Sequence, residues 1–382
     1  MKRYGHGLVV GRFRPPHAGH HHLVRTARER CERLTVVVHG TAAESPPPAD
    51  RVAWMREIHP DALVVDAADE PPGGLRDHSA ALPAGLRDAE AWDARAALVR
   101  AAVPEPVDAV FTAAPYGQEL ARRLGAASVR VEPGPAGRSL TSAAVRADPV
   151  AHWDALEAPV RAALARRVVV LGAERTGATT LALALTDHYR RRGGVWARTR
   201  CVPDHGRAYE ELRLAELRAE RPGAGRSDVR LHSADFPVIA LRQAELEEEA
   251  ARAGSPVLVC DSDAFAATIR HERHLGTSSP GTGEIAARGR QHLWLLTDHR
   301  GIALADDGPG DGPGDGRGDG RGDAAQLRPW MTARLLTRLA RTGRRTVVLT
   351  GPHEERLATA VAAVDALLAE ARHVTDPLPE HR

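Results

Sequence analysis

The first half of the chain is organised around the stretch Gly11-Arg12-Phe13-Arg14-Pro15-Pro16-His17-Ala18-Gly19-His20. A short apolar run, Gly7-Leu8-Val9-Val10, precedes it, and a helical pattern follows. This order of strand, glycine-bearing turn and helix places backbone N–H groups and the positive end of a helix dipole on one spot. His17 and His20 add two imidazoles there, and Gly19 lets the backbone come close to a ligand. The stretch therefore predicts a cradle for the phosphates of a nucleotide.

Two other interpretations of these histidines are open to the sequence. His17 and His20 on their own are compatible with an ordinary polar loop, but the strand and helix on either side favour a ligand site. The run His20-His21-His22 suggests a metal cluster. Adjacent residues on a helix point in different directions, however, and no carboxylate or cysteine stands at a matching spacing. Phosphate binding is the interpretation that the context favours.

Composition limits the class of partner. The chain has 382 residues, enough for two domains, and its 52 basic and 50 acidic residues give a formal net charge of +2. No global field recruits nucleic acid or a membrane, so we expect small-molecule partners, no nucleic acid and no membrane. The isolated cysteines Cys31, Cys201 and Cys260 fit a reducing compartment, and no signal peptide or membrane span is recognisable. The sequence predicts a cytoplasmic protein. It leaves open whether the protein forms a homo-oligomer.

Short apolar runs alternate with helical patterns along the chain, and the alternation starts twice. The runs of the first series are residues 7–10, 34–38, 62–65, 109–111 and 128–131, and those of the second are 167–171, 257–260, 292–296 and 346–349. A further helix is expected over 234–253. Continuous β-branched runs between helices are typical of parallel sheets buried on both faces. We therefore predict an α/β fold with two doubly wound parallel-sheet domains, residues 1–163 and 164–382.

A second phosphate loop opens the second domain. The run from Gly172 to Thr180 follows a predicted strand and leads into a helix, with the spacing G-x-x-x-x-G-K-[ST]. Gly172, Gly177 and the backbone N–H groups are suited to phosphates, and Thr179 offers a hydroxyl to Mg²⁺. Ala178 stands where the lysine belongs, so a point charge is missing, and Arg175 is the nearest candidate to supply it. A glycine-bracketed turn without a ligand is the other interpretation.

Two carboxylates follow the predicted strand 257–260. Because the carboxyl ends of strands form the ligand crevice of an α/β sheet, Asp261 and Asp263 are candidates to hold Mg²⁺ through water, bind substrate hydroxyls or act as a general base. Helix capping is the alternative for Asp263. Residues 307–323 repeat aspartate every four residues between glycine-rich units, which predicts a disordered loop; calcium binding is a weaker interpretation.

These two phosphate sites, in this order, resemble the NadR-type family, which combines nicotinamide-nucleotide adenylyltransferase with ribosylnicotinamide kinase. The matching stretches of the first domain are the turn described above, Arg51 with Trp54, Pro115-Tyr116-Gly117, and Leu140 to Arg146. The resemblance implies that His17, His20 and Arg146 act on the phosphates of ATP. It further implies that nucleotide is bound by Gly11, Phe13, Gly19, Arg51 and Tyr116.

The resemblance extends through the second domain. It includes the phosphate loop, the run Val202 to Tyr209, and the Asp261-Ser262-Asp263 element. It implies a catalytic role for Asp261, Mg²⁺ binding at Thr179, and ligand binding by Gly172, Arg175, Gly177, Thr179, Thr180, Asp204, Arg207 and Asp263. Magnesium is the implied cofactor and ATP the implied co-substrate.

Several positions depart from the family pattern, so activity at each site is a separate question. Ala113-Ala114, Ser142-Ala143, Ala178 and Ala208 replace the usual residues. The first hypothesis is transfer of AMP from ATP to nicotinamide mononucleotide, giving NAD, with a kinase half acting on nicotinamide riboside. A nucleotidyltransferase for another phosphorylated acceptor and a catalytically dead nucleotide sensor remain as alternatives.

Overall fold

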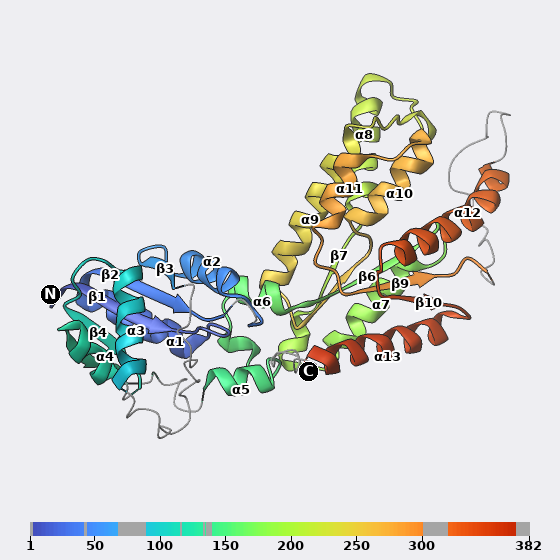
Figure 1. The fold of residues 1–382 in the computed structure, drawn as a ribbon. Coiled ribbons are helices and arrows are strands. Elements are labelled where there is room, and N and C mark those ends of the chain that lie inside the picture. Colours follow the sequence, from blue (N-terminus) through green and yellow to red (C-terminus); the bar gives the residue numbers. More distant parts are fainter. Residues whose placement is uncertain are drawn as a thin grey trace. The chain divides into compact units, whose positions relative to one another are not determined.

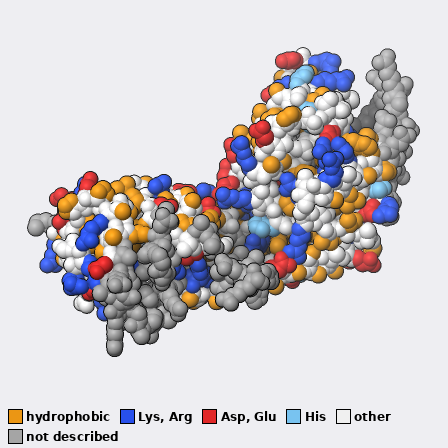
Figure 2. All heavy atoms as spheres, in the orientation of Figure 1, with side chains coloured by type: hydrophobic (Ala, Val, Ile, Leu, Met, Phe, Trp, Pro, Cys, Tyr) orange, Lys and Arg blue, Asp and Glu red, His pale blue; other side chains and the backbone are white. Residues whose placement is uncertain are grey.

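The computed structural model describes residues 3–41, 44–67, 89–114, 117–132, 134, 140–300 and 320–371. The chain divides into two compact units, Met1–Val160 and Arg161–Ala369. Each unit contains one five-stranded sheet (Figure 1). Acidic and basic side chains are interspersed on the face of each unit shown in Figure 2. Over the described residues, none of the helices has the length and apolar character needed to cross a membrane.

The sheet of the first unit has the strand order β3-β2-β1-β4-β5, and all of its strand pairs are parallel. The strands are β1 (Tyr4–Gly11), β2 (Cys31–His39), β3 (Leu63–Ala67), β4 (Ala109–Thr112) and β5 (Ala127–Arg130). The helices are α1 (Ala18–Arg30), α2 (Pro48–Ile58), α3 (Ala89–Ala102), α4 (Gly117–Leu124), α5 (Ser142–Ala147) and α6 (Ala158–Leu164), the last of which runs across the division between the units. Because β2 and β4 lie on opposite sides of β1, the strand order reverses at β1, and ligands of such sheets bind where it does.

Alternate residues of β1 fill two hydrophobic cores. Val9 packs with Leu23 of α1 and Met55 of α2 on one face of the sheet. Leu8 packs with Trp92 of α3 and Leu120 of α4 on the other. Because successive strand residues point to opposite faces, a continuous apolar run is what a strand covered on both sides requires.

The second unit repeats this plan with the strand order β10-β9-β6-β8-β7, again with parallel pairs. The strands are β6 (Arg166–Gly172), β7 (Arg200–Val202), β8 (Val257–Cys260), β9 (Leu293–Thr297) and β10 (Thr346–Leu349). The main helices are α7 (Ala178–Arg190), α8 (His205–Glu220), α9 (Asp235–Ala253), α10 (Ala264–Leu275), α11 (Pro280–Ala287), α12 (Gly320–Arg341) and α13 (His353–Ala371). One core of this unit joins β6, β8 and β9 to α7 and α13. Here the strand order reverses at β6.

The predicted α/β fold with two parallel sheets is confirmed. Two details differ from the sequence-based expectation. Strand β7 has only three residues, too few to produce an apolar run that stands out in the sequence. Helix α12 begins at Gly320 and so includes the last four residues of the predicted disordered loop 307–323, ahead of the buried Met331 and Leu335 of the same helix. The rest of that loop lies outside the described residues, as does Tyr116.

Candidate functional sites

The turn after β1 is organised by His17. His17 precedes α1 as its N-cap, and its Nδ1 accepts a hydrogen bond from the backbone N–H of Gly19 at 3.2 Å. In a neutral imidazole the proton then belongs to Nε2, which lies 3.3 Å from the hydroxyl of Ser142. A Cβ at Gly19 would lie 3.1 Å from Cε1 of His17, so this glycine makes room for the capping imidazole. The sequence had suggested that Gly19 makes room for the nucleotide.

His20 lies between two rings. Its ring centroid is 3.8 Å from that of His17 and 5.0 Å from that of Phe13, which meets it edge to face. Burial, and next the neighbouring His17, hold the pKa of His20 well below its usual value, so the ring is neutral near pH 7. Phe13 is buried with a φ of 49°, and a Cβ at Gly11 would lie 3.1 Å from the Phe13 ring. Gly11 and Phe13 thus shape the turn behind the two histidines.

Helix α5 brings a third predicted residue to the turn. Thr141 caps this helix by accepting a hydrogen bond from the N–H of Ala144 at 3.1 Å. From the last turn of α5, Arg146 donates to the carbonyl of Arg14 at 2.8 Å. Ser142, on the same helix, contacts His17 as described above. The structure therefore brings His17, His20 and Arg146 together, although Arg146 is far from the histidines in the sequence.

Arg51 lies behind the same turn. Its side chain is fully buried and donates to the carbonyl of Arg12, to the carbonyl of His39 at 3.3 Å and to Glu44 Oε2 at 2.6 Å. Glu44 also forms ion pairs with Arg12 at 3.4 Å and Arg14 at 3.3 Å. Burial lowers the pKa of Arg51, and the Glu44 carboxylate opposes that shift. These contacts of Arg51 shape the turn, and sequence reasoning missed Glu44 because no motif marks it.

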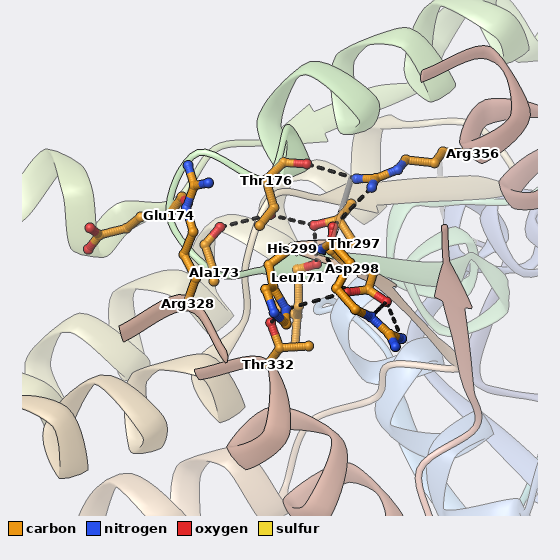
Figure 3. Close-up of polar contacts among 11 residues, drawn as sticks. Leu171, Ala173, Glu174, Thr176, Thr297, Asp298, His299, Arg328, Thr332 and Arg356 are labelled. Carbon is orange, nitrogen blue, oxygen red and sulfur yellow. Dashed lines mark hydrogen bonds and ion pairs between the residues drawn. The ribbon is translucent and has the colours of Figure 1, made fainter. Parts of the chain in front are cut away.

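The second site is the loop between β6 and α7 (Figure 3). A Cβ at Gly172 would collide with the hydroxyls of Thr297 and Thr176, so this position requires glycine. The Thr176 hydroxyl donates to the carbonyl of Ala173 at 2.7 Å and lies 2.7 Å from that of Thr297, which ties the loop to β9. Arg175 and Gly177 have left-handed φ values of 61° and 82°. Loops with such alternating backbone conformations form concavities of N–H groups that bind anions.

Thr179 and Asp261 meet beside this loop. Thr179 lies in the first turn of α7, and Asp261 directly follows β8, the neighbour of β6. Burial raises the pKa of Asp261 to about 6, although a hydrogen bond from Thr179 works against the shift. A hydroxyl and a carboxylate in these positions fit Mg²⁺, which takes its remaining ligands from phosphates and water. The described residues contain no group of three or more His, Cys, Asp or Glu side chains arranged for a metal.

Other predicted residues of the second site occupy different positions. Asp204 caps α8 through the N–H of Gly206 at 3.0 Å and pairs with Arg270, whose Nη1 donates to it at 2.9 Å. Arg207 is exposed on α8, and Thr180 is exposed on α7. The carboxylate of Asp204 is therefore already engaged by protein groups.

Asp263 has a structural position. It is buried, and it caps α10 by accepting a hydrogen bond from the N–H of Ala266 at 2.8 Å. Its other oxygen accepts from the indole N–H of Trp294 at 2.8 Å. Burial raises its pKa, against these two hydrogen bonds. The geometry favours the capping alternative over the predicted ligand binding, because both carboxylate oxygens bond to protein groups.

Each unit thus ends its central strand in a loop shaped for phosphates, which defines a two-unit α/β protein of the nucleotide-binding type. The second unit matches the model of an AAA domain over residues 167–356. The trifunctional NAD biosynthesis/regulator protein NadR of Escherichia coli (strain K12) is 22% identical over 321 residues, covering 78% of this chain and 70% of that protein. The protein of the same name from Salmonella typhimurium is 21% identical over 318 residues, covering 78% of this chain and 70% of that protein.

Two further comparisons concern a short part of the sequence and the fold. The nicotinamide-nucleotide adenylyltransferase of Aeropyrum pernix is 40% identical over 70 residues, 18% of this chain and 38% of that enzyme. A crystal structure of a NadR protein in complex with NAD and AMP-PNP superposes with a TM-score of 0.65 at 17% identity, covering 100% of both chains. The chain is thus NadR-like in sequence and in fold, which confirms the resemblance drawn from its motifs.

Proposed function

We propose that the first unit transfers AMP from ATP to nicotinamide mononucleotide, giving NAD and pyrophosphate. One observation carries this proposal: His17, His20 and Arg146 converge on one turn where the strand order reverses. The names of the E. coli and A. pernix relatives support a function in NAD biosynthesis. In this reaction a phosphate oxygen of the acceptor attacks the α-phosphorus of ATP. The bond from the α-phosphorus to the bridging oxygen breaks, and pyrophosphate leaves with the electron pair.

The side chains divide the work according to their charge. His20 is neutral, so a protonated nitrogen of its ring acts as a hydrogen-bond donor to a phosphate oxygen. Arg146 supplies a permanent positive charge. The attraction between this charge and the leaving pyrophosphate becomes stronger as negative charge develops on the pyrophosphate. Mg²⁺, when bound with ATP, neutralises charge on the phosphates.

For the second unit we propose nucleotide binding with slow phosphorylation of nicotinamide riboside. The loop from Gly172 to Gly177 and the Thr179–Asp261 pair support binding of a Mg²⁺–nucleotide. Ala178 leaves the loop without its lysine, and phosphoryl transfer depends on positioning and on neutralising the transferred group. A solved NadR protein in complex with NR adds support for this acceptor.

The test is incubation of the full chain with ATP, Mg²⁺ and nicotinamide mononucleotide, with NAD measured by chromatography. His17→Ala and His20→Ala are each expected to lower turnover by about two to four orders of magnitude. His22→Ala is the matched control, since it removes an imidazole of the same helix that lies 3.2 Å from the carbonyl of Glu132. Rates near that of the wild type in both site variants would contradict the proposed roles. If pyrophosphate is released only with another phosphorylated acceptor, the alternative is favoured, in which the first unit is a nucleotidyltransferase for that acceptor.

A further inference from the structure

Two arginines hold the outer side of the second phosphate loop (Figure 3). Arg328 of α12 donates through Nε to the carbonyl of Glu174 at 2.9 Å and through Nη2 to that of Arg175 at 3.3 Å. Arg356 of α13 donates through Nη1 to the carbonyl of Thr176 at 3.0 Å. Three consecutive carbonyls of the loop therefore bond to cations that come from the C-terminal part of the chain.

Arg356 also joins the loop to two other segments. Its Nη2 donates to the carbonyl of Asp298 at 2.9 Å, just after β9, and its Nε donates to that of Gly351 at 2.7 Å, just after β10. The side chain is buried, with 4% of its surface exposed. Burial lowers its pKa, and the nearby Asp298 opposes the shift. A buried guanidinium held by three backbone carbonyls fixes the loop with respect to the sheet.

Because of peptide geometry, these contacts orient the backbone N–H groups of the loop. The C=O and N–H of a planar trans peptide point in opposite directions, so carbonyls held outward direct the following N–H groups toward the concave side of the loop. The N–H of Thr176 closes a turn onto the carbonyl of Ala173 at 3.2 Å. The peptides that begin at Glu174 and Thr176 therefore direct the N–H groups of Arg175 and Gly177, the two residues with left-handed φ. A charged donor on the carbonyl also polarises the peptide and strengthens its N–H as a donor.

We propose that Arg328 and Arg356 are positioning residues of the phosphate loop, which hold its N–H groups ready for the phosphates of ATP. This inference rests on the proposed nucleotide binding by the second unit. The arrangement accounts for a loop that keeps its binding shape although Ala178 replaces the lysine, because preorganised dipoles replace part of what a mobile point charge supplies. It also makes nucleotide binding depend on the docking of α12, the helix that carries Arg328.

The experiment measures the affinity of the full chain for AMP-PNP with Mg²⁺ by titration calorimetry. His17→Ala with His20→Ala serves as the reference protein, so that binding at one site per chain reports the second unit. Arg328→Ala is expected to weaken the affinity about tenfold, because two charge-assisted hydrogen bonds to the loop are lost. Arg328→Lys is expected to weaken it to a similar extent, since an ammonium group keeps the charge but cannot hold two carbonyls in a fixed fork.

The matched control is Arg334→Ala, which removes a cation of the same helix that pairs with Glu272 at 2.6 Å. Its affinity is expected to stay within about twofold of the reference. Titrations are run well below the melting temperature of each variant, so a purely structural role would lower that temperature and leave the affinity unchanged. Reference-like affinity in Arg328→Ala, or full rescue by Arg328→Lys, would overturn the positioning role. A reference protein that binds no AMP-PNP would overturn the nucleotide-binding proposal as well. Arg356→Lys is a second variant, with the same expected loss of affinity.

Discussion

A buried histidine pair predicts that acid destabilises the first unit. His21 of α1 is fully buried, and its Nδ1 lies 3.0 Å from Nε2 of His59, which is also buried. Two neutral rings can form this hydrogen bond, because it needs a proton on only one of the two nitrogens. Burial, followed by smaller effects of His59 and Arg25, lowers the pKa of His21 from 6.5 to about 3.

The sign and size of the effect follow from proton linkage. Between about pH 6.5 and pH 3, His21 is protonated in the unfolded chain but neutral in the folded chain. The free energy of unfolding therefore falls as the pH falls through this window. At pH 5 the loss from His21 is about 2 kcal/mol, and it depends little on the folded pKa, which lies well below 5. For a unit of this size the loss lowers the melting temperature by about 4–8 °C.

The measurement is scanning calorimetry of the wild type and His21→Asn from pH 7.5 to pH 5. Asparagine places an amide where Nδ1 stands, so it keeps a polar group facing His59 but cannot take up a proton. His21→Asn should therefore lose about 2 kcal/mol less than the wild type over this interval. His22→Asn, one residue along α1, keeps His21 and should retain the wild-type pH dependence. Equal losses in the wild type and His21→Asn, within about 0.5 kcal/mol, would refute the assignment of a buried neutral His21.

Three further predictions concern the two sites. Arg51→Met leaves Glu44 and two carbonyls without their buried donor. It should lower the free energy of unfolding, measured in urea, by about 3–5 kcal/mol. A loss below about 1 kcal/mol would show that the cluster adds little stability. Asp263→Ala removes the α10 cap and the hydrogen-bond partner of Trp294. It should lower the free energy of unfolding of the second unit by about 2–4 kcal/mol and leave NAD synthesis unchanged. Lost NAD synthesis in the folded variant would contradict the structural role of Asp263. Ala178→Lys should raise the turnover of nicotinamide riboside phosphorylation by about tenfold or more, measured with radiolabelled ATP, and an unchanged rate would mean that another cation already supplies the charge.

Local sequence patterns predicted most of the architecture, although they missed the three-residue strand β7. The apolar runs predicted both sheets because a strand covered on two faces needs no information beyond its own residues, as Leu8 and Val9 illustrate by entering different cores. The two phosphate loops were visible for the same reason, since a strand, a glycine turn and a helix follow each other without interruption in the chain. The resemblance then linked His17 and His20 to Arg146.

The sequence alone determined the alternation of strands and helices apart from β7, the two turns and the candidate residues that lie on them. Tertiary structure alone decided which side chains meet: Glu44 and Arg51 behind the first turn, Trp294 and Asp263 at the cap of α10, and Arg328 and Arg356 at the second loop. The physical reason is that a turn is formed by neighbours in the chain, which a motif records. A buried hydrogen bond between residues more than 150 positions apart, such as that from Arg356 to Thr176, arises only when packing of the whole sheet brings two distant segments together.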